Sequence, residues 1–134
     1  MNEKLSYNRC AVQYNVQQKT WRLVNNHSYK CNGSTLTAKA GYTFDLASIP
    51  RFFWRLIAPY ELSLVAPLFH DLLYEYQGKL PDKTYVKPYK IYTRKETDRL
   101  FLDIMKLKGV SYWRRNLAYF AVRLFGWKAW NDLG

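Results

Sequence analysis

The chain has 134 residues, of which 49% are hydrophobic and 18% aromatic, and this composition excludes a largely disordered protein. The length fits one core, so we expect residues 1–134 to form a single domain. The formal net charge is +11, and 13 of the 21 basic residues lie in residues 79–134, with 5 of the 10 acidic ones. The charge predicts an anionic partner or surface, although no motif of a sequence-specific nucleic-acid reader is present.

Segments that enter or cross membranes are not evident. No run approaches the roughly 20 apolar residues that span a bilayer. The N-terminus also lacks the apolar stretch of a secretory signal peptide. We therefore expect neither a transmembrane segment nor a cleaved leader.

Residues 9–44 have the alternation and turn signals of β structure. Apolar side chains occupy every second position over residues 10–16 and again over 36–40. Asn-Gly at 32–33 marks a turn. This segment is predicted to be one small antiparallel sheet, with His27 as a solvated turn residue.

After Asp45, apolar residues recur at helical spacing. A short helix is expected over residues 49–57. A longer one should run from 63–65 to about Gln77, because Gly78 is a typical stop. Together with two helices farther along, this predicts an α+β fold, a small N-terminal antiparallel β-sheet followed by a bundle of three or more α-helices.

The C-terminal half begins with residues 79–92, which have two prolines and no sustained period and are predicted to be an exposed connection. Thr93 and Glu96 form a capping box, so a helix should start there and end at Gly109. A last helix follows Ser111. Its apolar stripe is predicted to pack in the core, or alternatively to lie on an anionic lipid layer beside basic residues. The stripe comprises Trp113, Leu117, Phe120, Ala121 and Leu124.

His70 stands out as a candidate for chemistry. Helical spacing puts His70 and Tyr74 on one face, while Asp71 projects about 100° away. A general base and an acidic metal ligand can share such a helix. Alternatively, His70 is a hydrogen-bonded core histidine and Asp71 a solvated charge.

Asp98 is the second candidate, because it shares a stripe with Phe101 and Met105 on the next helix. If that stripe packs against the His70 helix, Asp98 needs a buried partner, and an imidazole N–H is suitable. Such a pair supports general-base hydrolysis. An intrahelical ion pair between Arg94 and Asp98 is the alternative.

Several motifs recur along the chain in a specific order, and together they resemble the domain of unknown function DUF1353, a family found largely in bacteriophage and prophage genomes. The resemblance covers residues 20–132. The motif residues are Phe44 to Arg51, His70 to Tyr74, Arg94, Asp98, Phe101, Met105, Tyr119, Val122, Arg123, Gly126 and Trp130.

The segments His70-Asp71-Leu72-Leu73-Tyr74 and Thr97 to Phe101 are also similar to the two catalytic helices of phospholipases A2. This resemblance implies that His70 is the base, Asp98 its partner, Tyr74 a supporting donor and Asp71 a calcium ligand. The glycine-rich calcium loop of that family has no counterpart here, and calcium requires six to eight oxygen ligands. Asp45 is the carboxylate we expect to help, with a helix cap as its alternative role.

Two functions from different classes follow. The first is a phage-encoded, metal-assisted hydrolase of an ester such as a phospholipid, in which Ca²⁺ is the expected ion. The second is a non-catalytic virion component of the tail or connector, or a binder of a host factor, whose polar residues are structural. The resemblance implies synthesis in the host cytoplasm and, for the second function, incorporation into the virion. The expected partner is membrane lipid or another phage protein.

Overall fold

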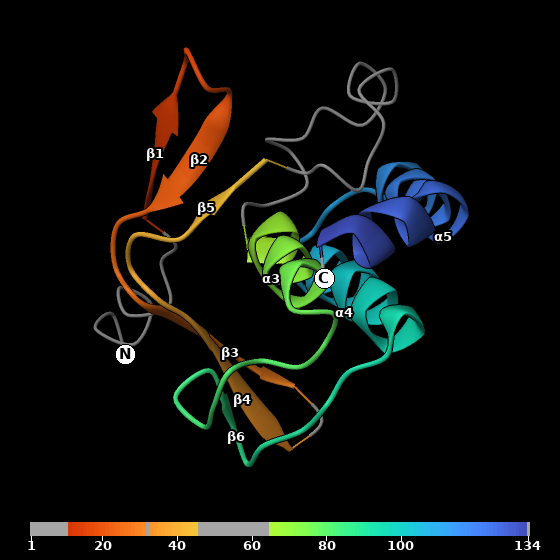
Figure 1. Cartoon of the computed structure of the whole chain (residues 1–134). Helices are drawn as coiled ribbons and strands as arrows, with labels where there is room; N and C mark the ends of the chain where they lie inside the picture. Colours follow the sequence, from red (N-terminus) through yellow and green to blue (C-terminus); the bar gives the residue numbers. More distant parts are fainter. Residues whose placement is uncertain (1–10, 32, 46–64, 134) are drawn as a thin grey trace. The chain divides into compact units, whose positions relative to one another are not determined.

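A computed structural model of the chain describes residues 11–31, 33–45 and 65–133. They form two compact units, each described here by itself. Unit 1 lies within Met1–Asp45 and Pro81–Lys90, and unit 2 within Leu46–Leu80 and Ile91–Gly134. The described part has two small antiparallel sheets followed by helices (Figure 1), which confirms the predicted α+β class. The single domain over residues 1–134 stays a prediction.

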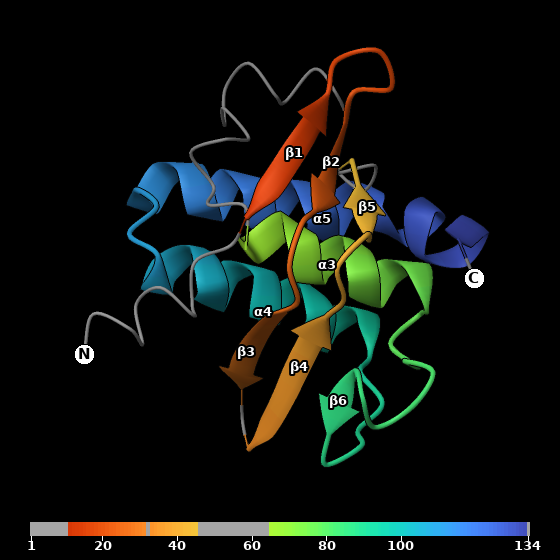
Figure 2. The ribbon, with the colours of Figure 1, turned by 90° about the vertical axis from the view of Figure 1, so that its left-hand side faces the viewer.

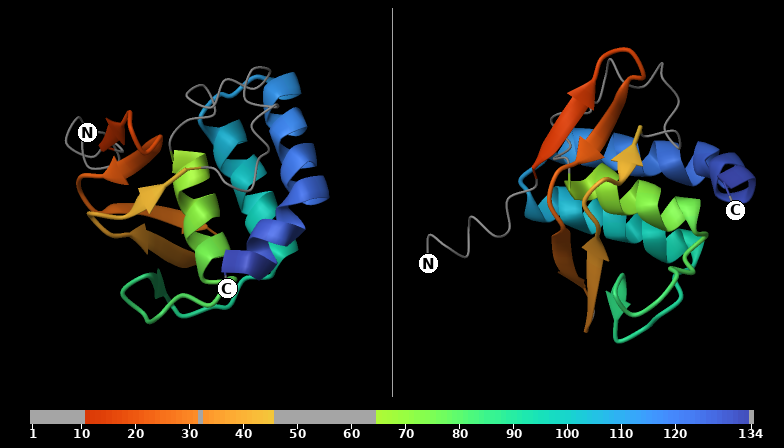
Figure 3. Two further views of the ribbon diagram at one scale, coloured as in Figure 1. Left: turned by 45° about the horizontal axis from the view of Figure 1, so that its top comes forward. Right: turned by 60° about the vertical axis from the view of Figure 1, so that its left-hand side comes forward.

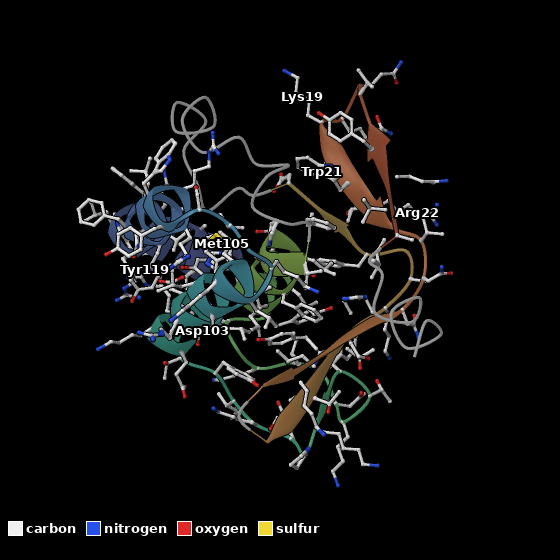
Figure 4. All side chains as sticks on the ribbon, turned by 180° about the vertical axis from the view of Figure 1, so that it is seen from behind. Lys19, Trp21, Arg22, Asp103, Met105 and Tyr119 are labelled. Atoms are coloured by element: carbon white, nitrogen blue, oxygen red, sulfur yellow. The ribbon has the colours of Figure 1, made fainter. Side chains whose placement is uncertain are left out.

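The first sheet of unit 1 is held by aromatic pairs across its strands. Trp21 lies opposite both Tyr14 and Phe44 in the register, with ring centroids 5.0 Å and 6.0 Å away. Such cross-strand pairs are the main stabilising unit of a sheet. Arg22 follows on the other side of its strand (Figure 4), as the two-residue period requires. The sheet has the order β1 (Val12–Asn15), β2 (Thr20–Leu23), β5 (Thr43–Phe44).

A second sheet in unit 1 has the order β3 (His27–Cys31), β4 (Ser34–Ala38), β6 (Val86–Lys87). Gly33 has a φ of 83°, the left-handed conformation that the turn between β3 and β4 needs. The prediction of one sheet was wrong, because alternation identifies strands but not the strands with which they pair. His27 was also misjudged. It opens β3 opposite Ala38 and is 4% exposed, so it is not a solvated turn residue.

The predicted exposed connection over residues 79–92 is confirmed for most of its side chains, but it contains a short strand that the sequence did not indicate. β6 pairs with β4 through Val86 and Leu36, and Val86 is fully buried. Leu80 and Tyr92, near the two ends of the segment, are also buried. A strand of two residues is too short to show alternation, so its pairing leaves no signal in the sequence.

Unit 2 contains α3 (Val65–Glu75), α4 (Arg94–Leu107) and α5 (Tyr112–Leu133) in its described part, and the three helices lie side by side (Figures 2 and 3). The predicted capping box is confirmed, since Thr93 accepts from the Glu96 N–H and Glu96 accepts from the Thr93 N–H. Gly109, with a φ of 82°, stops α4 as predicted, whereas α3 ends at Glu75 and the left-handed conformation after it begins at Gln77, before Gly78. The helix predicted over residues 49–57 lies outside the described residues.

The core face of α5 differs from the prediction. Most of the stripe is exposed, with Phe120 at 58% and Leu124 at 49%, whereas Ala118 and Val122 are fully buried. α5 is apolar on both faces, and spacing cannot show which face turns inward. Small residues let α5 approach its neighbours closely, which favours that face. No helix in residues 65–133 has the length and apolar character needed to cross a membrane.

Candidate functional site

The inward faces of α3, α4 and α5 bring together a set of polar side chains that we call the Asp98 cluster. His70 and Tyr74 come from α3, Arg94 and Asp98 from α4, and Arg123 from α5. His70 and Tyr74 are four residues apart, and so are Arg94 and Asp98. This spacing places each pair on one face of its helix. The capping box sets the start of α4 at Arg94. Local helix chemistry therefore aligns the cluster.

The Asp98 carboxylate is the centre of the cluster and is fully buried. Among the described residues, four donors reach it. The Oδ1 atom accepts from His70 Nε2 at 2.8 Å and from the Tyr74 hydroxyl at 2.5 Å. The Oδ2 atom accepts from Arg123 Nη1 at 2.7 Å and from Arg94 Nη1 at 3.3 Å. Both oxygens are thus well satisfied, as a buried carboxylate requires.

This environment keeps Asp98 ionised. Burial by itself raises the pKa of the Asp98 carboxyl group, but the hydrogen bonds from His70, Tyr74 and Arg123 and the charge on His70 together hold it below its ordinary value. Asp98 is therefore an anion at neutral pH. A fixed buried anion stabilises any cation that forms beside it, and the imidazole ring of His70, which contacts Asp98, can become such a cation.

Arg94 connects α4 to the middle of α5 in addition to meeting Asp98. Its Nη1 atom donates to the Val122 carbonyl oxygen at 3.0 Å, and its Nη2 atom donates to the Arg123 carbonyl oxygen at 3.3 Å. The fork of the guanidinium group makes this multiple contact possible. Arg94 thereby fixes the position of the helix that supplies Arg123.

The imidazole ring of His70 is held between Tyr74 and Phe101, with ring centroids 4.2 Å and 4.5 Å away, and its side chain has no exposure. While Nε2 meets Asp98, Nδ1 lies 4.0 Å from Asp71 Oδ1, which is beyond hydrogen-bond distance. Burial lowers the pKa of His70, but the hydrogen bond to Asp98 and the negative charges of Asp71 and Asp98 outweigh it, so that the pKa is raised. The ring is a stronger base than a free histidine.

Tyr74 supports the pair of His70 and Asp98 as a permanent hydrogen-bond donor to Asp98. Burial and the neighbouring Asp98 charge raise the pKa of its hydroxyl group, which therefore stays protonated. Its ring meets the edge of Trp130, at 5.0 Å between centroids. A Cβ atom at Gly126 would lie 2.5 Å from the Tyr74 hydroxyl oxygen, so a larger residue at this position of α5 would have to displace the Tyr74 side chain.

The structure brings together three predicted site residues, His70, Tyr74 and Asp98. The two partnerships considered for Asp98 coexist, because it contacts both His70 and Arg94. Asp71 lies beside the other nitrogen of His70. Asp45 belongs to unit 1, which is described separately from unit 2.

Sequence reasoning missed Arg123 as a partner of Asp98. Arg123 comes from a third helix, and helical spacing gives no reason to pair it with Asp98. The one signal in the sequence was its place among the motif residues of the DUF1353 resemblance.

The donor set for calcium is incomplete in the residues described. Calcium takes six to eight oxygen ligands, and Asp71 supplies one carboxylate beside His70. Within residues 11–31, 33–45 and 65–133, no three His, Cys, Asp or Glu side chains converge on a possible metal position. These residues do not by themselves fit a calcium site, and no chemical step is assigned to an ion.

Comparison with known proteins identifies one family. A family model described as "Protein of unknown function (DUF1353)" matches residues 21–122, which include every member of the Asp98 cluster except Arg123. No curated protein and no solved structure matches the chain. The chemistry of the cluster therefore has to be inferred from its own geometry.

Proposed function

The chain belongs to the DUF1353 family, and from the geometry of the Asp98 cluster we propose that it is a hydrolase that uses His70 as a general base on an ester such as a phospholipid. One observation carries the proposal. Asp98 binds Nε2 of His70 at 2.8 Å and so directs the basic lone pair to Nδ1, on the side of Asp71. A carboxylate that fixes the tautomer of a histidine in this way is the recurrent arrangement of general-base hydrolysis.

In the proposed reaction, Nδ1 of His70 takes a proton from water while the water oxygen attacks the ester carbonyl carbon. The imidazolium that forms is stabilised by the ionised Asp98, which Tyr74 and the arginines hold in place. The same proton then passes to the leaving alkoxide as the ester bond breaks. Because His70 must be neutral to accept the proton, activity should rise with pH through its raised pKa.

For a divalent ion, we propose only which residues would bind it and assign it no chemical step. Asp71, whose side chain is 10% exposed, is the carboxylate we propose for Ca²⁺, and the ligand role expected for Asp45 stays a prediction from the sequence. The role of Asp71 is testable by removing the ion with a chelator and by Asp71→Asn. Hydrolysis that is unaffected by both changes would remove calcium from the proposal and leave the His70 base in place.

The test of the hydrolase compares the wild-type protein with His70→Gln and with the matched control Asp103→Asn on the outer face of α4. The substrates are a short-chain nitrophenyl ester and phospholipid vesicles, with calcium present. We expect His70→Gln to lower the rate about 10²- to 10⁴-fold and the control to leave it unchanged. A folded wild-type protein that hydrolyses neither substrate, or a fully active His70→Gln, would contradict the proposal.

A second function is favoured by a specific observation. Among the described residues, Asp98 has four donors, and the His70 side chain has no exposure. Such a satisfied cluster also suits a non-catalytic phage protein, either a tail or connector component of the virion or a binder of a host factor. In that case, His70→Gln and Asp98→Asn would lower stability strongly, and the wild-type protein would hydrolyse no ester.

A further inference from the structure

The outward face of α5 carries a stripe of large apolar side chains. At 100° per residue, the stripe falls within a strip about 60° wide and about 21 Å long. Its members are each close to half exposed or more, at 52%, 58%, 49% and 57%. A contiguous exposed apolar surface of this kind marks an interaction site. We call these four residues, Trp113, Phe120, Leu124 and Trp127, the α5 stripe, which differs from the stripe predicted from the sequence.

Cationic side chains flank the α5 stripe. Arg114 and Lys128 are the basic neighbours next to its two terminal tryptophans, and the guanidinium group of Arg114 lies 4.8 Å from the ring centroid of Trp113. Residues 112–131 contain no Asp or Glu. The partner of the stripe must therefore combine an apolar layer with negative charge.

We propose that the α5 stripe binds flat on the surface of an anionic lipid bilayer. Tryptophan favours the boundary between headgroups and acyl chains, and helices with aromatic residues beside cations lie in the plane of that boundary. Lys128, which is exposed, would face the lipid phosphates. A second copy of the chain fits less well, because an antiparallel pairing of two stripes would bring cations of both copies together. This proposal goes beyond ester hydrolysis and does not depend on it.

The test uses vesicles of phosphatidylglycerol and of phosphatidylcholine, with binding followed by sedimentation and by tryptophan emission. We compare Phe120→Glu, within the stripe, with Leu107→Glu, which changes an exposed apolar residue at the end of α4 by the same charge. Both side chains are exposed, so both variants should fold. We expect the wild-type protein to bind phosphatidylglycerol at least about tenfold more tightly than phosphatidylcholine, and less tightly at high salt.

Phe120→Glu should weaken this binding about tenfold or more, and Leu107→Glu by less than about twofold. Failure of the wild-type protein to prefer anionic vesicles, or equal losses in the two variants, would overturn the proposal. A dimer in solution that Phe120→Glu dissociates, without vesicle binding by the wild-type protein, would assign the stripe to a second copy and also overturn it. His70→Gln should bind vesicles as the wild-type protein does, so a failure of the hydrolase proposal remains distinguishable.

Discussion

Helix α4 carries two Arg–Asp pairs of the same spacing on opposite faces. Arg94 and Asp98 approach to 3.3 Å, and Arg99 and Asp103 to 3.2 Å. The side chain of Asp98 has no exposure, whereas that of Asp103 is 42% exposed. In Figure 4, Asp103 is labelled on the same helix as Met105, which is fully buried. Spacing along a helix therefore indicates an ion pair, but the face of the helix decides what the pair does.

The two pairs should differ greatly in energy. An exposed pair at this spacing contributes a few tenths of a kcal/mol, because water and salt screen it. Removing one member of a buried set of charges costs much more, since the remaining charges are left without compensation. The difference can be measured on one helix of one protein.

The largest effect is expected from replacing the two aspartates by asparagine. Asp98→Asn removes the anion that compensates Arg94, Arg123 and protonated His70, and it places an amide N–H₂ group among donors. We expect a loss of about 3–5 kcal/mol in the free energy of unfolding for Asp98→Asn and less than about 0.5 kcal/mol for Asp103→Asn. Urea denaturation measures both. Similar losses in the two variants would mean that the cluster is not a compensated buried ion set.

The next largest effect on stability is expected from replacing an arginine that contacts Asp98. Arg123→Ala removes one charged hydrogen bond to Asp98, which keeps its other donors, so we expect a loss of about 1.5–3 kcal/mol in the free energy of unfolding. Arg99→Ala on the outer face is the matched control, with a loss of a few tenths of a kcal/mol. Thermal unfolding at low and high salt checks both values. The interaction of Arg123 with the buried Asp98 should be the less sensitive to salt.

A slightly smaller effect is expected from Gly126→Ala, which tests how closely the inner face of the helix layer is packed. The new methyl group would overlap the Tyr74 hydroxyl, and overpacking of this kind costs about 1–3 kcal/mol in the free energy of unfolding. Lys128→Ala, exposed on the same helix, should change stability by less than about 0.5 kcal/mol. A Gly126→Ala variant that is more stable than the wild-type protein, as helix propensity alone predicts, would show that Tyr74 can move aside.

The smallest effect is the pH dependence of the stability that His70 and Asp98 contribute. The pKa of His70 is raised above its unfolded value of 6.5, so its contribution is complete below pH 6.5 and is lost as pH rises through the folded pKa. The pKa of Asp98 is lowered below 3.8, so its contribution is complete above pH 3.8 and is lost as pH falls through the folded pKa. Both are present between pH 3.8 and 6.5.

Urea denaturation across pH tests this dependence. The stability that the wild-type protein has over His70→Gln should be greatest within that window and should shrink on its alkaline side. An advantage that grows above neutral pH would contradict the raised pKa of His70.

The elements predicted well from the sequence are those set by local chemistry. The capping box at Thr93 and the left-handed Gly109 depend on residues within one helical turn, and each is where the sequence indicates. These local features need no knowledge of distant contacts. The proximity of His70 and Asp98, in contrast, was one of two alternatives and was predicted only on the condition that their helical stripes pack together.

The features that sequence reasoning missed depend on distant parts of the chain. β6 exists because Val86 pairs with Leu36, fifty residues earlier, and two residues are too few to show a period. The inward face of α5 is set by the room that Ala118, Val122 and Gly126 leave for α3 and α4. Arg123 reaches Asp98 only as a consequence of that choice.

The central claim is that Asp98 holds Nε2 of His70 and makes Nδ1 the basic atom. The most direct measurement is ¹⁵N NMR of the imidazole nitrogens across pH, with His27→Gln to assign the other histidine of the chain. We expect the Nε2–H tautomer in the neutral ring, a pKa of His70 above 6.5, and a lower pKa in Asp98→Asn. An Nδ1–H tautomer, or a pKa below 6.5 that Asp98→Asn leaves unchanged, would contradict the claim and with it the general-base function.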